Sequence, residues 1–214
     1  MERVIITIAR QYGSGGKTLG KALAKNMGIN CYDRELMRLA SDESGISESM
    51  FGQVDERLKK SPLLKITKNV YQGQLIPPDD DDFTSGDNLF NYQAKIIKQL
   101  AAEESCVIIG RCADYVLKGM ENVVSVFVHA PKDYCMMLAK ERLGYPDKEV
   151  EKYIAKTDKN RAEYYKYHTG HTWYDARNYD LCIDSSKVTQ EEAIEVIKDY
   201  IRIRFRENGR QADR

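Results

Sequence analysis

The chain has 214 residues, a length that favours one domain with an appended lid or insertion, and its composition of 42% hydrophobic and 31% charged residues is that of an ordinary globular protein. Lysine plus arginine and aspartate plus glutamate number 33 each, so there is no net charge to attract a nucleic acid or an anionic membrane, and we expect neither as a partner.

No segment approaches the roughly twenty apolar residues that span a bilayer, so we expect a cytoplasmic protein. The five cysteines are odd in number and contain no CxxC pair, which indicates neither a disulfide framework nor a zinc cluster. The three histidines do not form a metal-spaced set on one predicted helix.

The pattern of strands and helices begins with Val4 to Ala9, an apolar, β-branched run that predicts a strand buried on both faces of a parallel sheet. A glycine-rich turn follows. From Thr18 the apolar spacing becomes helical, and Gly28 is placed as a C-terminal cap. Further strands are predicted at residues 29–32, 106–109, 123–128 and 179–183, with one helix opened by Pro131 and a last helix over about residues 190–206.

Strands that alternate with helices predict an α/β fold, in which a five-stranded parallel sheet lies between two layers of helices. Two stretches do not follow this alternation. Residues from about 45 to 100 contain helical patterns around a proline- and aspartate-rich loop over 76–88, which favours a mobile, solvated excursion. Residues 144–178 are polar and lack a strand signal. We therefore expect one domain with its core at 1–44, 101–143 and 179–214, an insertion at 45–100 and a lid at 144–178.

The segment from Ala9 to Thr18 lies between the first strand and its helix, where a phosphate-binding loop belongs. Glycines allow successive backbone N–H groups to turn inward around an anion, and the helix N-terminus adds partial positive charge. Lys17 would then reach the β- and γ-phosphates of a nucleotide, and the Thr18 hydroxyl would bind Mg²⁺. The pattern GxxxxGK[ST] has glycine where Gln11 stands, so the loop is expected to follow a variant path.

Polar residues that follow the other strands are further candidates, because ligands of open parallel sheets collect at the carboxyl ends of the strands. Asp33 follows the second strand and is either a helix cap or a ligand-binding residue, two roles that do not exclude each other. Arg111 follows the third strand, where a guanidinium group is suited to hold a phosphate in a bidentate manner.

Asp158 and Arg161 are three residues apart and so share one face of a predicted helix in the expected lid. An arginine that arrives from a lid can neutralise charge on a transferring phosphoryl group. The alternative is an intrahelical ion pair on a solvated face, and the spacing alone does not choose between them.

Together, these segments resemble the cytidylate kinase-like family of P-loop proteins. The similarity covers most of the chain in order, through IARQYGSGGKTLGKALA, CYDRELM, VIIGRCADYVL, TDKNRAEYY and YDLCIDSS. The resemblance implies ATP as the donor, a nucleoside monophosphate such as CMP as the acceptor, and Mg²⁺ as the shared ion. It also implies that the chain is a single P-loop kinase domain, in which the insertion at 45–100 binds the acceptor.

The resemblance also implies roles for individual residues. Asp33 and Arg111 would hold the acceptor, Arg142 would lie near the donor, and Asp158 with Arg161 match the later part of the family's lid pattern R-x-x-x-D-x-x-R. The donor phosphates would be bound by Gly13, Ser14, Gly15, Gly16, Lys17 and Thr18, with Lys17 stabilising the charge in transit.

Three positions depart from the family pattern. Cys112 stands where cytidylate kinases have aspartate, Ile154 where they have the first lid arginine, and Gln11 where the loop pattern has glycine. The expected function is phosphoryl transfer from ATP to CMP or dCMP. Two alternatives remain open: a nucleotide sensor with little turnover, and a P-loop kinase of a different small metabolite. The sequence does not indicate an oligomeric state.

Overall fold

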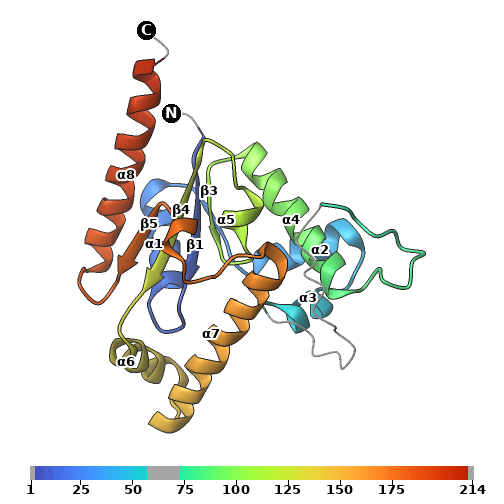
Figure 1. Cartoon of the computed structure of the whole chain (residues 1–214), viewed down its shortest axis with the longest axis horizontal. Coiled ribbons are helices and arrows are strands. Elements are labelled where there is room, and N and C mark those ends of the chain that lie inside the picture. The colour runs from blue at the N-terminus through green and yellow to red at the C-terminus, as the bar shows by residue number, and fades with distance from the viewer. Residues whose placement is uncertain (1–2, 57–72, 212–214) are drawn as a thin grey trace.

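The structure is a computed structural model that describes residues 3–56 and 73–211 (Figure 1). Within these residues five parallel strands form one sheet in the order β2-β3-β1-β4-β5. Each strand lies within two residues of its predicted position, which confirms the predicted α/β fold. The strands are β1 (Ile5–Arg10), β2 (Asn30–Tyr32), β3 (Cys106–Ile109), β4 (Val123–His129) and β5 (Leu181–Asp184).

The central strand β1 pairs with β3 on one side and with β4 on the other. Every residue of β1 is buried, which explains its nearly uninterrupted apolar sequence. Because the chain crosses over in opposite directions on the two sides of β1, a crevice opens at the carboxyl end of this strand. The loop that follows β1 therefore lies where an open parallel sheet binds its ligands.

One face of the sheet is covered by α1 (Gly16–Met27) and α8 (Gln190–Gln211) (Figure 1). Leu23 of α1 and Ile197 of α8 are fully buried against the strands. The predicted cap at Gly28 is confirmed, since this glycine has a φ of 66° and donates its N–H to carbonyl oxygens of the last helical turn.

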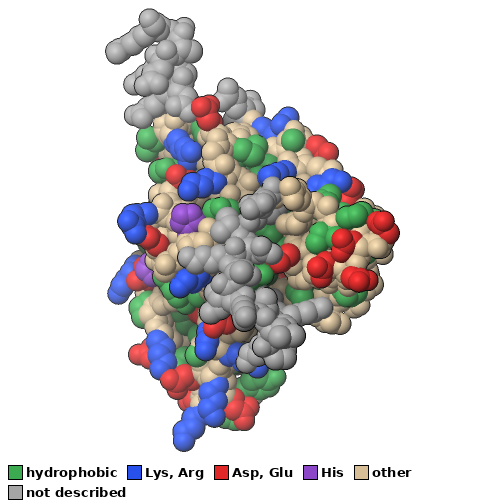
Figure 2. All heavy atoms as spheres, turned by 45° about the vertical axis from the view of Figure 1, so that its right-hand side comes forward, with side chains coloured by type: hydrophobic (Ala, Val, Ile, Leu, Met, Phe, Trp, Pro, Cys, Tyr) green, Lys and Arg blue, Asp and Glu red, His purple; other side chains and the backbone are tan. Residues whose placement is uncertain are grey.

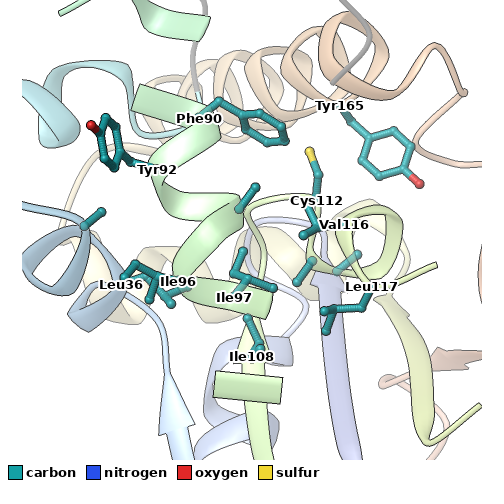
Figure 3. Close-up of a cluster of buried hydrophobic side chains, with 14 of the residues drawn as sticks. Leu36, Phe90, Tyr92, Ile96, Ile97, Ile108, Cys112, Val116, Leu117 and Tyr165 are labelled. Carbon is teal, nitrogen blue, oxygen red and sulfur yellow. The ribbon is translucent and has the colours of Figure 1, made fainter. Parts of the chain in front are cut away.

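The opposite face is covered by α2 (Glu35–Ser44), α4 (Gly86–Glu103), the short α5 (Ala113–Val116) and part of α7 (Asp147–Thr169). Figure 3 shows side chains of these helices converging over Ile108 of β3. At the junction of α4 and α7, Phe90 stacks on His168 with ring centroids 4.0 Å apart. Burial lowers the pKa of His168 to about 3, so this histidine is a neutral part of the core.

The segments expected to form the insertion and the lid contain α3 (Glu48–Val54), most of α4, α7 and the 3₁₀ turn η1 (Ala176–Asn178). Helix α6 (Lys132–Leu143) precedes α7. From the sequence, the apolar stretch from Ile46 to Leu75 is open to two interpretations, a partner surface or an acceptor-binding flap, and its residues 57–72 lie outside the described residues. The division of the domain into core, insertion and lid stays a prediction.

The loop over residues 76–88 is exposed at its aspartates but is held at its base by the buried Asn88. The Asn88 side chain accepts a hydrogen bond from the backbone N–H of Ile76 at 2.9 Å. Its amide donates to the carbonyl oxygens of Ile76 at 3.2 Å and of Phe83 at 2.7 Å. One buried amide therefore closes the loop.

Basic and acidic side chains are interspersed over the described surface visible in Figure 2, in keeping with the absence of net charge. None of the helices in residues 3–56 and 73–211 combines the length and apolarity that crossing a bilayer requires.

Candidate active site

The phosphate loop between β1 and α1 depends on glycines at two positions. Gly13 has a φ of 81°, and a Cβ on it would lie 2.3 Å from the carbonyl oxygen of Cys135 in α6. Gly16, the first residue of α1, also has no room for a side chain, since a Cβ there would lie 2.6 Å from Cβ of Arg10. The loop therefore packs closely against β1 and α6, and no side chain at these two glycines blocks its backbone from surrounding an anion.

Gln11, the departure from the loop pattern, anchors this loop. Its backbone N–H donates to the carbonyl oxygen of Val128 at 3.0 Å, and its side-chain oxygen accepts from the N–H of Ala130 at 3.1 Å. The positive φ values of the loop occur at Gly13 and Gly15, not at Gln11, so no glycine is required there. The variant path is thus built on a side-chain contact to the end of β4.

Ser14 is buried inside the loop rather than facing the cavity. Its hydroxyl donates to the carbonyl oxygen of Gln11 at 2.9 Å and accepts weakly from Gly16 N–H at 3.4 Å. Ser185, after β5, donates to the Ser14 carbonyl oxygen at 2.7 Å. The contribution of Ser14 to a bound phosphate is therefore through its backbone and through the shape of the loop.

Lys17 and Asp33 are brought together at the carboxyl ends of β1 and β2. The Lys17 Nζ lies 2.5 Å from Asp33 Oδ2, and the carboxylate is 6% exposed. Burial opposes the charge of Asp33, but the hydrogen bond from Lys17 and the charge of Arg10 outweigh it and lower the pKa of Asp33. Helix α2 begins after Arg34 without a side-chain cap, so the interpretation of Asp33 as a helix cap is wrong.

A carboxylate that sequence reasoning missed, Glu56, lies at the centre of the site. It accepts hydrogen bonds from Arg10 NH1 at 2.6 Å and from Arg161 Nε at 3.1 Å. Arg10 was also missed, although a charged residue at the end of a buried strand is a signal that could have identified it. Glu56 carries no such signal, because it follows α3 in a stretch without a recognisable motif.

Arg111 lies behind this cluster rather than on the cavity that contains Lys17. Its side chain is 1% exposed and forms an ion pair with Asp55. Its Nε has no hydrogen-bond partner among the described residues. Burial and the neighbouring charge of Arg10 lower the pKa of Arg111 to about 10. Direct contact between Arg111 and an acceptor phosphate therefore requires Asp55 to move away.

Cys112, the second departure, is a core residue. It is 5% exposed and packs in the cluster between α4, α5 and α7 (Figure 3). Burial raises the pKa of its thiol. Tyr164, Tyr165 and Trp173 are buried in the same cluster, so these aromatic side chains pack α7 and the segment after it against the body of the protein.

Asp158 and Arg161 lie on one face of α7, as predicted, and both contact the phosphate loop. Asp158 Oδ1 accepts from the N–H of Tyr12 at 2.8 Å and from Arg161 NH1 at 3.4 Å. Arg161 NH1 also donates to the carbonyl oxygen of Arg10 at 3.1 Å. Burial raises the pKa of Asp158 to about 6, against the effect of these donors. The pair is thus part of the site rather than of a solvated helix face.

One cavity joins these groups. Arg142, from the last turn of α6, lines it, and so does Tyr153, whose ring meets that of Tyr12 edge to face at 5.0 Å. Thr18 is exposed at the start of α1, next to the cavity residue Lys17. Ile154, the third departure, is half-buried on the α7 face of Asp158. Among the described residues, the charged side chains around the cavity are Arg10, Lys17, Arg34, Arg142 and Arg161, with Asp33, Asp55 and Glu56.

This excess of cations over carboxylates, beside a glycine loop at a helix N-terminus, suits a polyphosphate ligand. Within residues 3–56 and 73–211 no group of three or more His, Cys, Asp or Glu side chains is placed to hold a metal ion. The Thr18 hydroxyl remains suited to an ion that binds mainly through phosphate oxygens, as Mg²⁺ does.

Comparisons with known proteins agree with this geometry. Curated cytidylate kinases of Methanosarcina acetivorans and Methanosarcina mazei are 25% and 26% identical to this chain, over 90% of it and 93% of each relative. An uncharacterized protein from Eubacterium ventriosum has a solved structure with a TM-score of 0.69 at 28% identity, over 93% of this chain and 98% of that one. The shikimate kinase of Bacteroides thetaiotaomicron shares the fold, with a TM-score of 0.53 at 15% identity over 93% and 98% of the two chains.

The model of the family described as the Cytidylate kinase-like family matches residues 5–187. This match covers most of the 214 residues. The chain therefore belongs to the Cytidylate kinase-like family and is, as its sequence led us to expect, an ATP-dependent kinase.

Proposed function

We propose that this kinase transfers the γ-phosphoryl group of ATP to a nucleoside monophosphate, and that CMP or dCMP is the acceptor. The observation that carries the proposal is the meeting of Lys17, Asp33 and Arg161 around one cavity at the end of β1. The names of the curated relatives support the choice of acceptor. The proposed setting is the cytoplasm, where ATP and nucleoside monophosphates are available.

The donor phosphates would bind to the loop from Gly13 to Thr18. Its glycine backbone supplies N–H donors, and Lys17 is placed to neutralise charge that develops on the transferred group. Thr18 would hold Mg²⁺, which would offset the charge of the donor phosphates. Arg142 lines the cavity from α6 and would lie near the donor.

The acceptor would bind on the side of Asp33 and Arg111. Its phosphate is already ionised at neutral pH, so the reaction needs alignment and charge neutralisation rather than a general base. Lys17 would leave Asp33 for the donor phosphates, which frees the carboxylate for a hydroxyl group of the acceptor. Arg161 would neutralise the transferring group from α7, next to Asp158.

A kinase of another small metabolite is the second candidate, and the placement of Arg111 favours it. That guanidinium group is buried and paired with Asp55 instead of lining the cavity. With Cys112 in the core and Ile154 on α7, two charged groups of the family pattern, an aspartate and the first lid arginine, are replaced by apolar ones. A nucleotide sensor with little turnover is compatible with the same three observations.

The test is the release of ADP from ATP with Mg²⁺, with and without CMP, dCMP, UMP and AMP. We expect CMP or dCMP to stimulate release, and Lys17→Ala to reduce it at least about 100-fold, since a donor aimed at developing charge is lost. Lys25→Ala, an exposed change at the far end of the same helix, is the matched control and should retain activity.

Three outcomes contradict the proposal in different ways. Stimulation by a metabolite that is not a nucleotide would establish the second candidate. Tight ATP binding without any ADP release would establish a sensor. Undiminished turnover in the Lys17→Ala variant would show that the phosphate loop is assigned wrongly.

A further inference from the structure

We propose that Glu56 is a positioning residue, whose carboxylate holds Arg10 and Arg161 together as one binding site for a phosphate group in the cavity beside Lys17. The inference rests on the proposed function to the extent that both place phosphate groups in this cavity. It adds Arg10 to the ligand-binding residues and gives a role to a carboxylate that phosphate binding by itself does not explain.

The geometry joins three segments that are distant in the sequence. Glu56 Oε1 lies 2.6 Å from Arg10 NH1, at the end of β1, and accepts from the backbone N–H of Arg111 at 3.3 Å, after β3. Glu56 Oε2 lies 3.1 Å from Arg161 Nε, on α7. The side chains of Arg10, Glu56 and Arg161 are 8%, 13% and 13% exposed, so solvent screens these contacts weakly.

The local backbone is arranged to admit the carboxylate. Gly110 has a φ of 77°, and a Cβ on it would lie 2.1 Å from Glu56 Oε1 and 2.2 Å from Arg10 NH1. Glu56 itself has a φ of 49°, a left-handed conformation that is unfavourable for glutamate. The strained backbone of Glu56 and the space left by the missing side chain of Gly110 together indicate a contact that the fold maintains despite its cost in free energy.

Both guanidinium groups retain donors for a ligand. Arg161 uses Nε for Glu56 and NH1 for Asp158 and the Arg10 carbonyl oxygen, and Arg10 uses NH1 for Glu56. Within the described residues neither arginine forms a hydrogen bond through NH2, and both line the cavity with Lys17. Glu56 and Asp158 balance the charges of the two guanidinium groups, so attraction for a phosphate comes from their free N–H donors and from the excess of cations among the described residues that line the cavity.

The carboxylate remains ionised under all ordinary conditions. Burial opposes its charge, but Arg10 and Arg161 outweigh burial and lower the pKa of Glu56 to about 2. The cluster is therefore a permanent ion-pair network. The interpretation opposite to positioning is that the Glu56 carboxylate occupies the place of the phosphate and competes with it. The two interpretations predict opposite effects of removing the charge, because a negative charge beside an anion site weakens anion binding through Coulomb repulsion.

The experiment measures binding of inorganic tripolyphosphate by titration calorimetry to the full chain and its Glu56→Gln variant. We expect the variant to bind at least about tenfold more weakly, the equivalent of one charge-assisted hydrogen bond that is no longer positioned. Glu48→Gln, an exposed change of the same kind on α3, is the control and should bind within about twofold of the unmodified chain. Equal or tighter binding by Glu56→Gln would overturn the proposal.

A double-mutant cycle separates positioning from general damage to the fold. In a chain that already carries Arg161→Met, Glu56→Gln should weaken tripolyphosphate binding by less than about twofold, since the residue that it positions is gone. Weakening by the same factor in both backgrounds would show a merely structural role and would also overturn the proposal. If Glu56→Gln does not fold, Glu56→Asp replaces it, because the shorter side chain keeps the charge but cannot reach both arginines.

Tripolyphosphate binding requires neither an acceptor nor turnover. A failure of CMP to stimulate ADP release would contradict the proposed function and leave this result unaffected, and the reverse also holds.

Discussion

Replacing Gly13 by alanine tests whether the phosphate loop is a fixed cradle. A Cβ on Gly13 would lie 2.3 Å from the carbonyl oxygen and 2.9 Å from the carbonyl carbon of Cys135. Both atoms belong to the backbone of α6 and cannot rotate aside as the end of a side chain could. An ordinary contact begins at 3.4 Å, so the loop or the helix must move by 3.4 minus 2.3, or 1.1 Å.

The expected loss has two parts. A non-glycine residue at a φ of 81° costs about 1 kcal/mol of folding free energy. A displacement of the loop misplaces N–H groups that bind phosphate, and each charge-assisted hydrogen bond lost costs about 1.5–3 kcal/mol, or a factor of about 10 to 150 in ATP affinity. Titration calorimetry with ATP measures the second part, and the melting temperature Tm measures the first.

Gly28→Ala provides the matched control. Gly28 also has a positive φ, 66°, but a Cβ there meets nothing within 4 Å. This variant should lose about 2–4 °C in Tm and keep its ATP affinity. The reasoning is refuted if Gly13→Ala binds ATP as tightly as the unmodified chain, or if Gly28→Ala loses comparable affinity.

Two further variants test the core and the loop over residues 76–88. Burial raises the pKa of Asp114 to about 6, above its value in an unfolded chain, so its charged form weakens the fold as pH rises through 6. Asp114→Asn can still accept the hydrogen bond from Tyr165. In thermal melts this variant should be more stable than the unmodified chain by about 1–3 kcal/mol at pH 7.5 and equally stable near pH 4. The same difference in stability at the two pH values would contradict the assignment. Asn88→Ala removes three hydrogen bonds at a fully buried position, so it should lower the free energy of unfolding by about 2–4 kcal/mol and speed proteolysis within the loop over residues 76–88. An unchanged cleavage rate would show that the loop closes without Asn88.

The parts of the site that could be predicted are those that depend only on short segments of the sequence. Gly13 to Thr18 follow a buried strand and open a helix, and Asp158 and Arg161 are spaced for one helix face. The structure places Lys17 and Arg161 on one cavity together with Asp33, and Asp158 next to it, in contact with the backbone of Tyr12. Arg111 illustrates the limit of such reasoning, since its position after β3 was predicted but its burial behind Asp55 was not.

By itself the sequence determined the strands, the helices and the phosphate loop, because apolar periodicity and glycine placement act over a few neighbouring residues. Only the tertiary structure decided which charges meet. Glu56 is 46 residues from Arg10 and 105 from Arg161, and Tyr12 is 146 residues from the Asp158 carboxylate that it contacts. Such pairings depend on how parallel strands and their crossover helices bring remote segments to the same edge of the sheet, and no local pattern encodes that distance.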